Sequence, residues 1–312
     1  MVLAAGFGTR LRPLSELLPK PVVPVAGRPV ISFALETLSM HGIRDIAVNS
    51  HYLSDELREH MQGFVPPDVN LAFFHEQKIL GTAGGLKNAR AFLLDSTDPD
   101  DAIVVFNGKL VYQPDLSSAI ALHKQSGAIA TMLLQARAEG SHYGAIDLRS
   151  DGKVCGILRN EEPVDPALKR CMFTGVHILS KQAIEQLPDA GCVIRQGYVP
   201  WLERGETIVG MLDSNPWHEV STPTSYFEAN MSLLEDSAAW PSIQLSGSNI
   251  IDKQTMPLSR DIELDRCIIG KNVSLTEGIK LSRCIVWPRS QIRQSVTNSI
   301  ITPKHRLTMD RE

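Results

Sequence analysis

The sequence predicts an α/β fold in which helices cover a mostly parallel sheet, followed by a short domain built from strands alone. Three observations lead to this prediction. Short apolar runs alternate with helical patterns from the first residue to about residue 136. Glycine-containing turns follow several of these apolar runs. Beyond about residue 238 the helical periodicity stops and a short strand-like unit repeats.

The elements of the first part follow one another in a regular order. Residues 1–5 are an apolar run that is typical of a short buried strand. The predicted helices are 30–41, 54–61, 83–92 and 116–124, and the predicted strands are 43–48, 69–75, 102–106 and 128–136. This alternation indicates a three-layer, Rossmann-like domain that binds ligands beyond the carboxyl ends of its strands. The turn after residue 5, Gly81 and Asn107 each follow a strand, so we expect them on one rim of the sheet.

The pattern of predicted elements changes between about residues 143 and 198, where short strands replace the alternation of strands and helices. The predicted strands are 144–148, 154–158 and 173–179, and a further helix is predicted at 224–236. A boundary is expected near residue 238, which gives a first domain of residues 1–238 and a second of residues 239–312.

The second domain carries a repeat. Each unit of the repeat has small residues followed by two branched apolar ones, and the first apolar residues, Ile268, Ile285 and Ile300, lie 17 and 15 residues apart. This period is close to one coil of a left-handed β-helix with three flat faces of about six residues each. Repeats of fixed period must stack to bury an apolar face. An ordinary small β-sheet is the alternative interpretation.

Composition narrows the class of protein. The chain has 312 residues, 43% hydrophobic and 21% charged, as in ordinary globular enzymes. A formal charge of −4 without a Lys/Arg cluster argues against nucleic-acid binding. No apolar run is long enough to span a membrane. The five cysteines never form a Cys-x-x-Cys pair, so we expect reduced thiols and a cytoplasmic protein.

The most informative segment follows the first strand. Gly6 and Gly8 have no Cβ, so the backbone N–H groups of this turn can approach a phosphate chain. Arg10 adds a planar cation that suits phosphate oxygens. Lys20 lies between two prolines, which stiffen the backbone around it. The glycine spacing alone is weak, and a bare strand–turn is an alternative, but the missing third glycine excludes a dinucleotide-binding fingerprint.

The full segment is more specific than its glycines. Residues 3–13 read Leu-Ala-Ala-Gly-Phe-Gly-Thr-Arg-Leu-Arg-Pro, and residues 19–21 read Pro-Lys-Pro. This pattern resembles the signature of the sugar-1-phosphate nucleotidyltransferases, and the resemblance extends through nearly the whole chain. Within that family the pattern is most similar to mannose-1-phosphate guanylyltransferases, which implies GTP as the nucleotide.

The resemblance implies the roles of further residues. Arg10 and Lys20 would be catalytic, with Arg10 on the leaving pyrophosphate and Lys20 at the α-phosphate. The residues expected to bind nucleotide are Ala4, Ala5, Gly6, Gly8, Thr9, Gly81, Thr82 and Asn107. The residues expected to bind sugar are Gly144, Glu161, Thr174 and Gly175. Each turn has a structural alternative: a helix cap at Gly81, a β-bulge at Gly144 and a plain strand residue at Thr174.

The metal site departs from the family pattern. Lys109 occupies the position of the aspartate that holds Mg²⁺ in relatives, and Glu219 occupies the position of the second aspartate. Magnesium needs oxygen ligands, which Glu219 offers and Lys109 does not. Two unit positive charges about 4 Å apart repel by roughly 4 kcal/mol at an effective dielectric constant of about 20. His218 is expected to be a surface residue, and Asp115 is expected to cap a helix rather than bind metal.

The activity implied by the resemblance is the reaction of an NTP with a sugar 1-phosphate to give an NDP-sugar and pyrophosphate. The alternative is an inactive, nucleotide-sugar-binding regulatory subunit, which the altered metal ligands at Lys109 and Glu219 favour. Glu162, where relatives carry a lysine that holds the sugar phosphate, points the same way. The expected partners are the two substrates and further copies of the chain, with the C-terminal β-helix as the expected oligomer contact.

Overall fold

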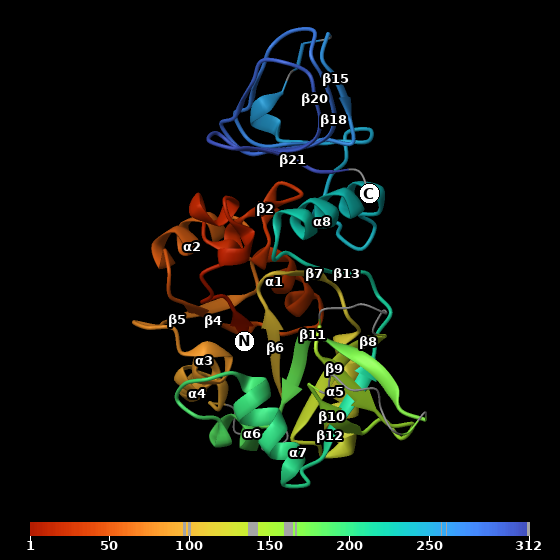
Figure 1. Cartoon of the computed structure of the whole chain (residues 1–312). Helices are drawn as coiled ribbons and strands as arrows, with labels where there is room; N and C mark the ends of the chain where they lie inside the picture. Colours follow the sequence, from red (N-terminus) through yellow and green to blue (C-terminus); the bar gives the residue numbers. More distant parts are fainter. Residues whose placement is uncertain are drawn as a thin grey trace. The chain divides into compact units, whose positions relative to one another are not determined.

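The computed structural model describes residues 1–95, 98, 101–136, 143–158, 165, 167–256, 258–259 and 261–310. The chain divides into two compact units, which are described separately. The first unit comprises Met1–Gly6, Phe33–Asp55 and Val65–Trp217, and the second comprises Phe7–Ser32, Glu56–Phe64 and His218–Glu312. The units interleave along the chain (Figure 1). These units are defined by contacts within the structure, and the predicted boundary near residue 238 between two domains stays a prediction.

The first unit contains the parallel sheet that the alternating pattern predicts. Its parallel strands are β1 (Val2–Leu3), β4 (Asp45–Ser50), β5 (Asn70–His75) and β6 (Ile103–Asn107). Strand β1 lies between β4 and β6, and β5 pairs with the outer edge of β4. Because all four strands run in the same direction, the segments that follow them leave the sheet at one edge.

The remaining strands of this sheet pair mainly in the antiparallel sense, which differs from the mostly parallel sheet that was expected. They are β8 (Ala130–Ala136), β9 (Ala145–Leu148), β10 (Val154–Ile157), β11 (Lys169–Leu179) and β12 (Ile208–Leu212). The long strand β11 runs antiparallel to β6, β8 and β9, whereas β12 is parallel to β8. A single 11-residue strand therefore joins the parallel part of the sheet to the antiparallel part.

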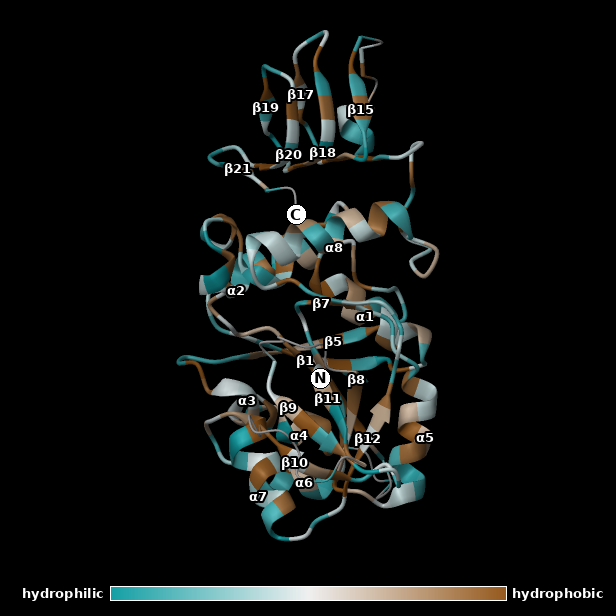
Figure 2. Ribbon diagram, turned by 45° about the vertical axis from the view of Figure 1, so that its right-hand side comes forward, coloured by the Kyte–Doolittle hydropathy of each residue, from teal (hydrophilic) through white to brown (hydrophobic). Residues whose placement is uncertain are grey.

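Helices lie on both sides of these strands. Figure 2 shows α7 to one side and α5 to the other, which agrees with a layered arrangement. The helices are α1 (Ile31–Met40), α3 (Gly81–Asn88), α4 (Arg90–Leu93), α5 (Leu116–Ser126), α6 (Lys181–Gln186) and α7 (Val199–Glu203). A short strand, β7 (Leu110–Tyr112), and a π-helical turn (Ile194–Tyr198) complete the unit. The single helix predicted at 83–92 is thus two helices that meet at Ala89.

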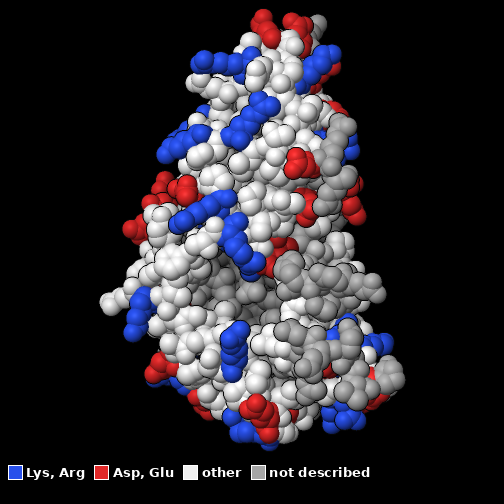
Figure 3. Space-filling view, viewed as in Figure 1, with Lys and Arg blue, Asp and Glu red and all other residues white. Residues whose placement is uncertain are grey.

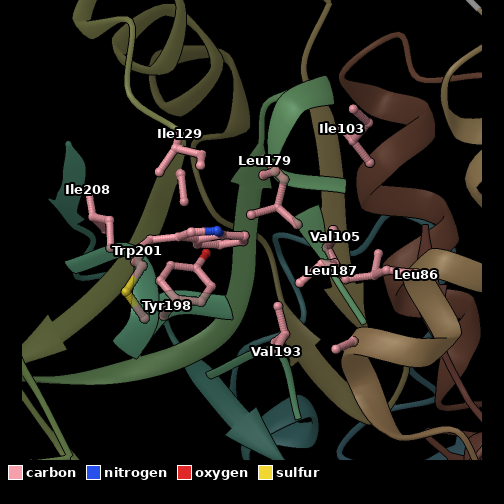
Figure 4. Close-up of a cluster of buried hydrophobic side chains, with 14 of the residues drawn as sticks. Leu86, Ile103, Val105, Ile129, Leu179, Leu187, Val193, Tyr198, Trp201 and Ile208 are labelled. Atoms are coloured by element: carbon pink, nitrogen blue, oxygen red, sulfur yellow. The ribbon is translucent and has the colours of Figure 1, made fainter. Parts of the chain in front are cut away.

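The core of the first unit lies between the sheet and the helices α3, α6 and α7. Tyr198 and Trp201 are fully buried there, with ring centroids 5.3 Å apart (Figure 4). The Trp201 indole N–H donates to Gln186 Oε1 at 2.9 Å, so its polar atom is satisfied. Leu86 of α3 belongs to the same cluster. Burial of these side chains fixes α3 against the sheet, and α3 carries the predicted Gly81–Thr82 turn at its start.

The second unit holds short elements near the chain start. These are three 3₁₀ turns (Thr9–Leu11, Leu14–Glu16 and Lys20–Val22), the hairpin of β2 (Pro24–Val25) and β3 (Arg28–Pro29), and α2 (Ser54–Met61). Strand β13 (Trp217–Glu219) leads to α8 (Pro223–Glu235), which matches the helix predicted at 224–236. Thr222 caps α8 by accepting a hydrogen bond from the Ser225 N–H.

The C-terminal part of the second unit is a stack of parallel strands. They are β14 (Ile250–Ile251), β15 (Glu263–Asp265), β16 (Ile268–Ile269), β17 (Ser274–Leu275), β18 (Lys280–Val286), β19 (Gln291–Ile292) and β20 (Val296–Ile301), and β21 (Arg306–Thr308) adds an antiparallel edge. Ile268 pairs with Ile285, and Ile285 with Ile300, as the repeat predicts. Figure 1 shows these coils with a triangular outline.

Alternate residues of these strands are buried on opposite sides. Ile269 and Val286 belong to the interior cluster of the coils, whereas the neighbouring Ile285 points the other way and is also buried. On that side β18 packs against α8. The Trp287 indole N–H donates to the Tyr226 hydroxyl at 2.9 Å, and Arg283 lies 5.7 Å from the centre of the Phe227 ring. The coils therefore bury apolar residues on two sides.

The surface and the cysteines fit the composition. On the face drawn in Figure 3, Lys and Arg side chains are interspersed with Asp and Glu side chains among the described residues. Within the described part of the chain, no disulfide links the five cysteines. None of the described helices combines the length and the apolar character that crossing a bilayer requires.

Candidate functional site

The first predicted turn begins directly at the edge of the parallel strands. Leu3, the last residue of β1, pairs with Asn107 of β6, so the Ala4–Gly6 segment and Asn107 leave neighbouring strands side by side. The Ala4 N–H donates to the Asn49 side-chain oxygen at 2.7 Å. No atom lies within 4 Å of the position that a Cβ on Gly6 would occupy. The prediction that the turn after residue 5 and Asn107 share one rim of the sheet is therefore confirmed.

Asn107 contacts the segment predicted to bind sugar. Gly175 has a positive φ of 89°, and a Cβ at this position would collide with the Asn107 side-chain nitrogen. Only glycine fits this close approach of two strands. The neighbouring Thr174 is 1% exposed, and its hydroxyl donates to the Leu133 carbonyl at 2.9 Å. This arrangement favours the structural alternative for the Thr174 side chain.

The other residues predicted to bind sugar differ in their surroundings. The ring of Tyr143 packs edge-on against Trp217, with centroids 5.4 Å apart. A Cβ on the adjacent Gly144 would lie 2.7 Å from the end of the flexible Leu158 side chain. Glu161, like Glu162, lies outside the described residues.

The start of α3 is fixed by the segment 189–193. Gly81 has a φ of 74°, and a Cβ there would collide with the Gly191 carbonyl oxygen. The Ala83 N–H donates to this same oxygen at 2.9 Å, and the Gly191 N–H donates to the Leu80 carbonyl at 2.7 Å. The Thr82 hydroxyl accepts from the Val193 N–H at 2.8 Å. Gly81 is thus required by a close approach of two backbones.

The second unit brings together the remaining predicted residues near the chain start. Gly8 has a φ of 68°, and a Cβ on it would lie 2.9 Å from Lys20 Cβ. The Ser15 hydroxyl donates to the Gly8 carbonyl at 2.8 Å. The 3₁₀ turn Thr9–Leu11 buries Leu11 and leaves the Arg10 side chain 61% exposed. The glycine turn, Arg10 and Lys20 therefore belong to one locally packed structure.

The residues at the predicted metal position do not fit a magnesium ion. Glu219 is buried, and its Oε1 lies 3.7 Å from Nη2 of Arg10, so its charge already has a cationic partner. Lys109 follows β6 and has no oxygen to offer. Asp213, another carboxylate of the first unit, accepts hydrogen bonds from the Asp115 and Asn215 N–H groups at 3.1 and 2.6 Å, so both of its oxygens have donors. Among the described residues, no three acidic, histidine or cysteine side chains converge as metal ligands do.

Two residues close in sequence to Lys109 and Glu219 belong to local structure. Asp115 accepts from the Ser118 N–H at 2.9 Å, so the predicted capping role is confirmed. The Ser118 hydroxyl donates to the same carboxylate at 2.6 Å, and this bond together with that from the Ser118 N–H lowers the pKa of Asp115. His218 is half-buried rather than on the surface, and burial lowers its pKa. His218 is less exposed than the expected surface position, because it lies on β13, where Trp217 and His218 are half-buried and Glu219 is buried.

Sequence reasoning missed two buried polar residues beside the first turn. Asn49 and Glu76 are 3% and 2% exposed and are joined by a hydrogen bond of 2.7 Å. Asn49 is the last residue but one of β4 and Glu76 directly follows β5, and polar residues at the carboxyl ends of such strands often belong to a site. Their separation of 27 residues gives no local pattern, so the signal was weak.

Known proteins are similar to this chain over most of its length. The model of the family described as nucleotidyl transferase matches residues 1–236. A UTP–glucose-1-phosphate uridylyltransferase of Synechocystis is 35% identical over 202 residues, which cover 60% of this chain and 50% of that enzyme. A mannose-1-phosphate guanylyltransferase of Mycobacterium tuberculosis is 25% identical over 247 residues, which cover 78% of this chain and 67% of that enzyme. The chain thus spans half to two thirds of the length of these relatives.

Solved structures agree on the fold. The structure of HddC from Yersinia pseudotuberculosis in complex with GMP-PN matches with a TM-score of 0.62 and 23% identity, covering 74% of this chain and 97% of that one. A UDP-glucose pyrophosphorylase from Acinetobacter baumanii matches with a TM-score of 0.62 and 20% identity, covering 76% of this chain and 94% of that one. With the family match over residues 1–236, the chain belongs to the nucleotidyl transferase family, as a relative of sugar-1-phosphate nucleotidyltransferases.

Proposed function

We propose that this protein transfers a nucleotidyl group from an NTP to a sugar 1-phosphate, giving an NDP-sugar and pyrophosphate. The packing of Lys20 against Gly8 carries the proposal, because it keeps a lysine stem in contact with a glycine turn suited to phosphate. Arg10 follows two residues after this glycine, with most of its side chain exposed. Two cations fixed around one phosphate-binding turn suit a polyphosphate better than a neutral ligand.

In the proposed reaction an oxygen of the sugar phosphate attacks the α-phosphorus and pyrophosphate leaves on the opposite side. This displacement needs no covalent enzyme intermediate, so catalysis is positioning and charge stabilisation. Lys20 stabilises the charge that grows at the α-phosphate, and Arg10 that on the leaving pyrophosphate. The proposed nucleotide contacts are Ala4, Ala5, Gly6, Gly8, Thr9, Gly81, Thr82 and Asn107. The proposed sugar contacts are the main chain of Thr174, Gly144 and Gly175, together with Glu161.

No step of this proposal passes through a metal ion, because the residues at the expected position do not fit one. The Glu219 carboxylate faces Arg10, and Lys109 brings a positive charge where relatives have a carboxylate. We propose that the Lys109 ammonium supplies positive charge to bound phosphate instead. The similarity to guanylyltransferases favours GTP as the nucleotide.

A second candidate function is a nucleotide-sugar-binding regulatory subunit without turnover. The ion pair of Glu219 with Arg10 favours it, since this pair engages both the carboxylate at the expected metal position and a proposed catalytic cation. The retained Lys20 favours the enzyme, because a binding protein has less use for a cation aimed at the α-phosphate.

The C-terminal coils extend the proposal. We propose that they wind as a left-handed β-helix, in keeping with the spacing of the stacked isoleucines and with left-handed backbone at Arg266, Arg283 and Asn298. These coils are the proposed contact between copies of the chain. The proposed compartment is the cytoplasm.

The test is pyrophosphate release from a panel of NTPs and sugar 1-phosphates, with Mg²⁺ and with chelator, by the unaltered chain and by Lys109→Asp. The matched control is Lys124→Asp, an equal change of charge at an exposed position of α5. Turnover by the unaltered chain supports the enzyme. Turnover by Lys109→Asp alone supports the second candidate. If no variant shows turnover and none binds an NDP-sugar, both candidates are overturned.

A further inference from the structure

A pair of buried polar side chains in the first unit joins two of the proposed nucleotide-binding turns. Asn49 lies near the end of β4 and Glu76 directly after β5. The Asn49 amide nitrogen donates to Glu76 Oε1 at 2.7 Å. The two side chains, 3% and 2% exposed, are here named the Asn49–Glu76 bridge. Neither residue has a role in the proposed reaction.

Each end of the bridge holds a backbone N–H. At one end Asn49 Oδ1 accepts from the Ala4 N–H at 2.7 Å, and at the other Glu76 Oε2 accepts from the Leu80 N–H at 2.9 Å. Ala4 is the first residue of the Ala4–Gly6 turn, and Leu80 precedes Gly81. Each hydrogen bond therefore fixes the residue at the base of a proposed nucleotide-binding turn.

The arrangement of donors and acceptors fixes how the two side chains of the bridge are oriented. A carboxylate only accepts hydrogen bonds, so Glu76 takes one N–H on each oxygen. The Ala4 N–H requires the oxygen of the Asn49 amide, which turns its nitrogen towards Glu76. The Glu76 backbone is itself held, because its N–H donates to the Ser50 carbonyl at 2.8 Å and its carbonyl lies 2.7 Å from His51 Nδ1.

Helix α3 packs directly on the bridge. A Cβ on Gly85 would lie 2.7 Å from the Asn49 side-chain nitrogen and 3.0 Å from Glu76 Oε1. The helix start thus has two fixed contacts, through Leu80 and through Gly85. A displacement of about 1 Å at a binding group can cost roughly 100-fold in rate, so rigid spacing of these turns matters for function.

We infer that Glu76 is a positioning residue, which acts through Asn49 to set the separation of the Ala4–Gly6 turn from the Gly81 turn and thereby the affinity for nucleotide. This inference rests on the proposed function, because that function assigns nucleotide to both turns. Neither side chain of the bridge touches the nucleotide itself.

The test compares Glu76→Gln, Asn49→Asp and the double variant that swaps the two functional groups. Glu76→Gln offers one acceptor and one NH₂ group, so one of its two N–H partners faces a donor. Asn49→Asp places two carboxylates against each other. In the double variant, the new carboxylate at position 49 can accept from the Ala4 N–H and from the new amide at position 76. The oxygen of that amide accepts from the Leu80 N–H, so all three hydrogen bonds can form again.

The measurements are the Kd for non-hydrolysable analogues of GTP and UTP, the Kd for NDP-sugar, and the thermal unfolding midpoint. Glu76→Gln is expected to weaken binding of both analogues about tenfold or more, the loss typical of a hydrogen bond to a charged group. The double variant is expected to return to within about threefold of the unaltered chain. The control is Asp147→Asn, which removes the charge of a largely buried side chain of the first unit that pairs with Arg170 at 3.3 Å. It is expected to lower the unfolding midpoint without changing the Kd for the NTP analogues.

The outcomes separate this inference from the function on which it rests. Failure of the unaltered chain to bind any analogue overturns both. Binding by the unaltered chain with an equal Kd for Glu76→Gln overturns the inference alone. A double variant that still binds weakly or fails to fold also overturns the inference. So does a change in the GTP-to-UTP preference that the double variant does not reverse, because such a change would mean that the bridge contacts the base directly. If only the single variants fail to fold, a double variant with restored Kd still supports it.

Discussion

Single residues decide the geometry of the turn near the chain start. Gly8 adopts a left-handed backbone that an L side chain rarely takes, and a Cβ there would press on the Lys20 stem. Lys20 in turn opens a 3₁₀ turn whose next residue, Pro21, is buried. The position of the lysine therefore depends on a glycine twelve residues earlier and on the rigidity of its own turn.

The variant Lys20→Ala is expected to lower kcat by about 100- to 1000-fold, the cost of removing one charge-stabilising group in the transition state. The thermal unfolding midpoint should change little, because Pro21 and Val22 keep their buried positions. Pyrophosphate release under saturating substrates measures the effect, with the exposed Lys124→Ala as control. Normal turnover by Lys20→Ala would remove this lysine from the mechanism.

Motif residues could be predicted from the sequence, and their partners could not. The glycine turn, Arg10 and Lys20 lie within fifteen residues, so a local pattern records them. Glu76 meets Asn49 and Leu80 only because β4 and β5 pair in parallel, a fact that no local spacing contains. Thr174 is a case in which the motif misled about the side chain: its position predicted a sugar contact, but its hydroxyl donates a hydrogen bond to the Leu133 carbonyl.

At the scale of elements, the periodicity of apolar residues predicts the longer helices, and their exact ends depend on packing. The predicted helix 54–61 matches α2, and the predicted helix 30–41 is Ile31–Met40. The 3₁₀ turns between Thr9 and Val22 escaped prediction because three-residue helices have no amphipathic period. Helices α6 and α7 were missed because each spans only five or six residues and Pro200 interrupts the pattern.

The isoleucine repeat gives a prediction for the C-terminal element. Ile285 is 1% exposed and sits between Ile268 and Ile300 in the parallel ladder. Ile285→Ala is expected to lower the free energy of unfolding by about 2–5 kcal/mol, through lost burial and a cavity in the stack. Urea unfolding followed by tryptophan fluorescence measures it, because Trp287 is two residues away. Ile79→Ala, at a more exposed position, is the control, and an equal loss in both would show that the ladder is not a packed core.

At the scale of the whole chain, the family match covers residues 1–236 and leaves the repeat region to be argued from its own pattern. The alternation of strands and helices correctly predicted the parallel strands β1, β4, β5 and β6. It did not predict the antiparallel pairs of β11, because a short apolar run has the same pattern whichever direction its neighbour takes. Strand direction follows from connections through the whole unit, which no single segment contains.

Buried histidines make the stability of the chain depend on pH. Burial lowers the pKa of His123 to about 4 and that of His177 to about 3, and their Nδ1 atoms lie 2.9 Å from the Thr131 hydroxyl and 2.7 Å from the Tyr198 hydroxyl. In the unfolded chain both histidines bind protons near pH 6.5. Below that pH the unfolded state therefore holds more protons than the folded state, so stability is complete above pH 6.5 and falls as the pH is lowered towards 4.

Between pH 7.5 and 5.5 each of these two histidines is expected to cost about 1.4 kcal/mol of the free energy of unfolding. This range stays above the usual pKa of carboxylates, so their protonation adds little to the loss. Urea unfolding at both pH values measures the difference for the unaltered chain and for His123→Gln with His177→Gln, which cannot titrate but can still form a hydrogen bond. The double variant should lose most of the pH dependence, whereas His60→Gln at an exposed position of α2 should keep it. An unchanged pH dependence in the double variant would mean that the two rings are hydrated, and that the interior around Tyr198 opens to water more readily than its complete burial indicates.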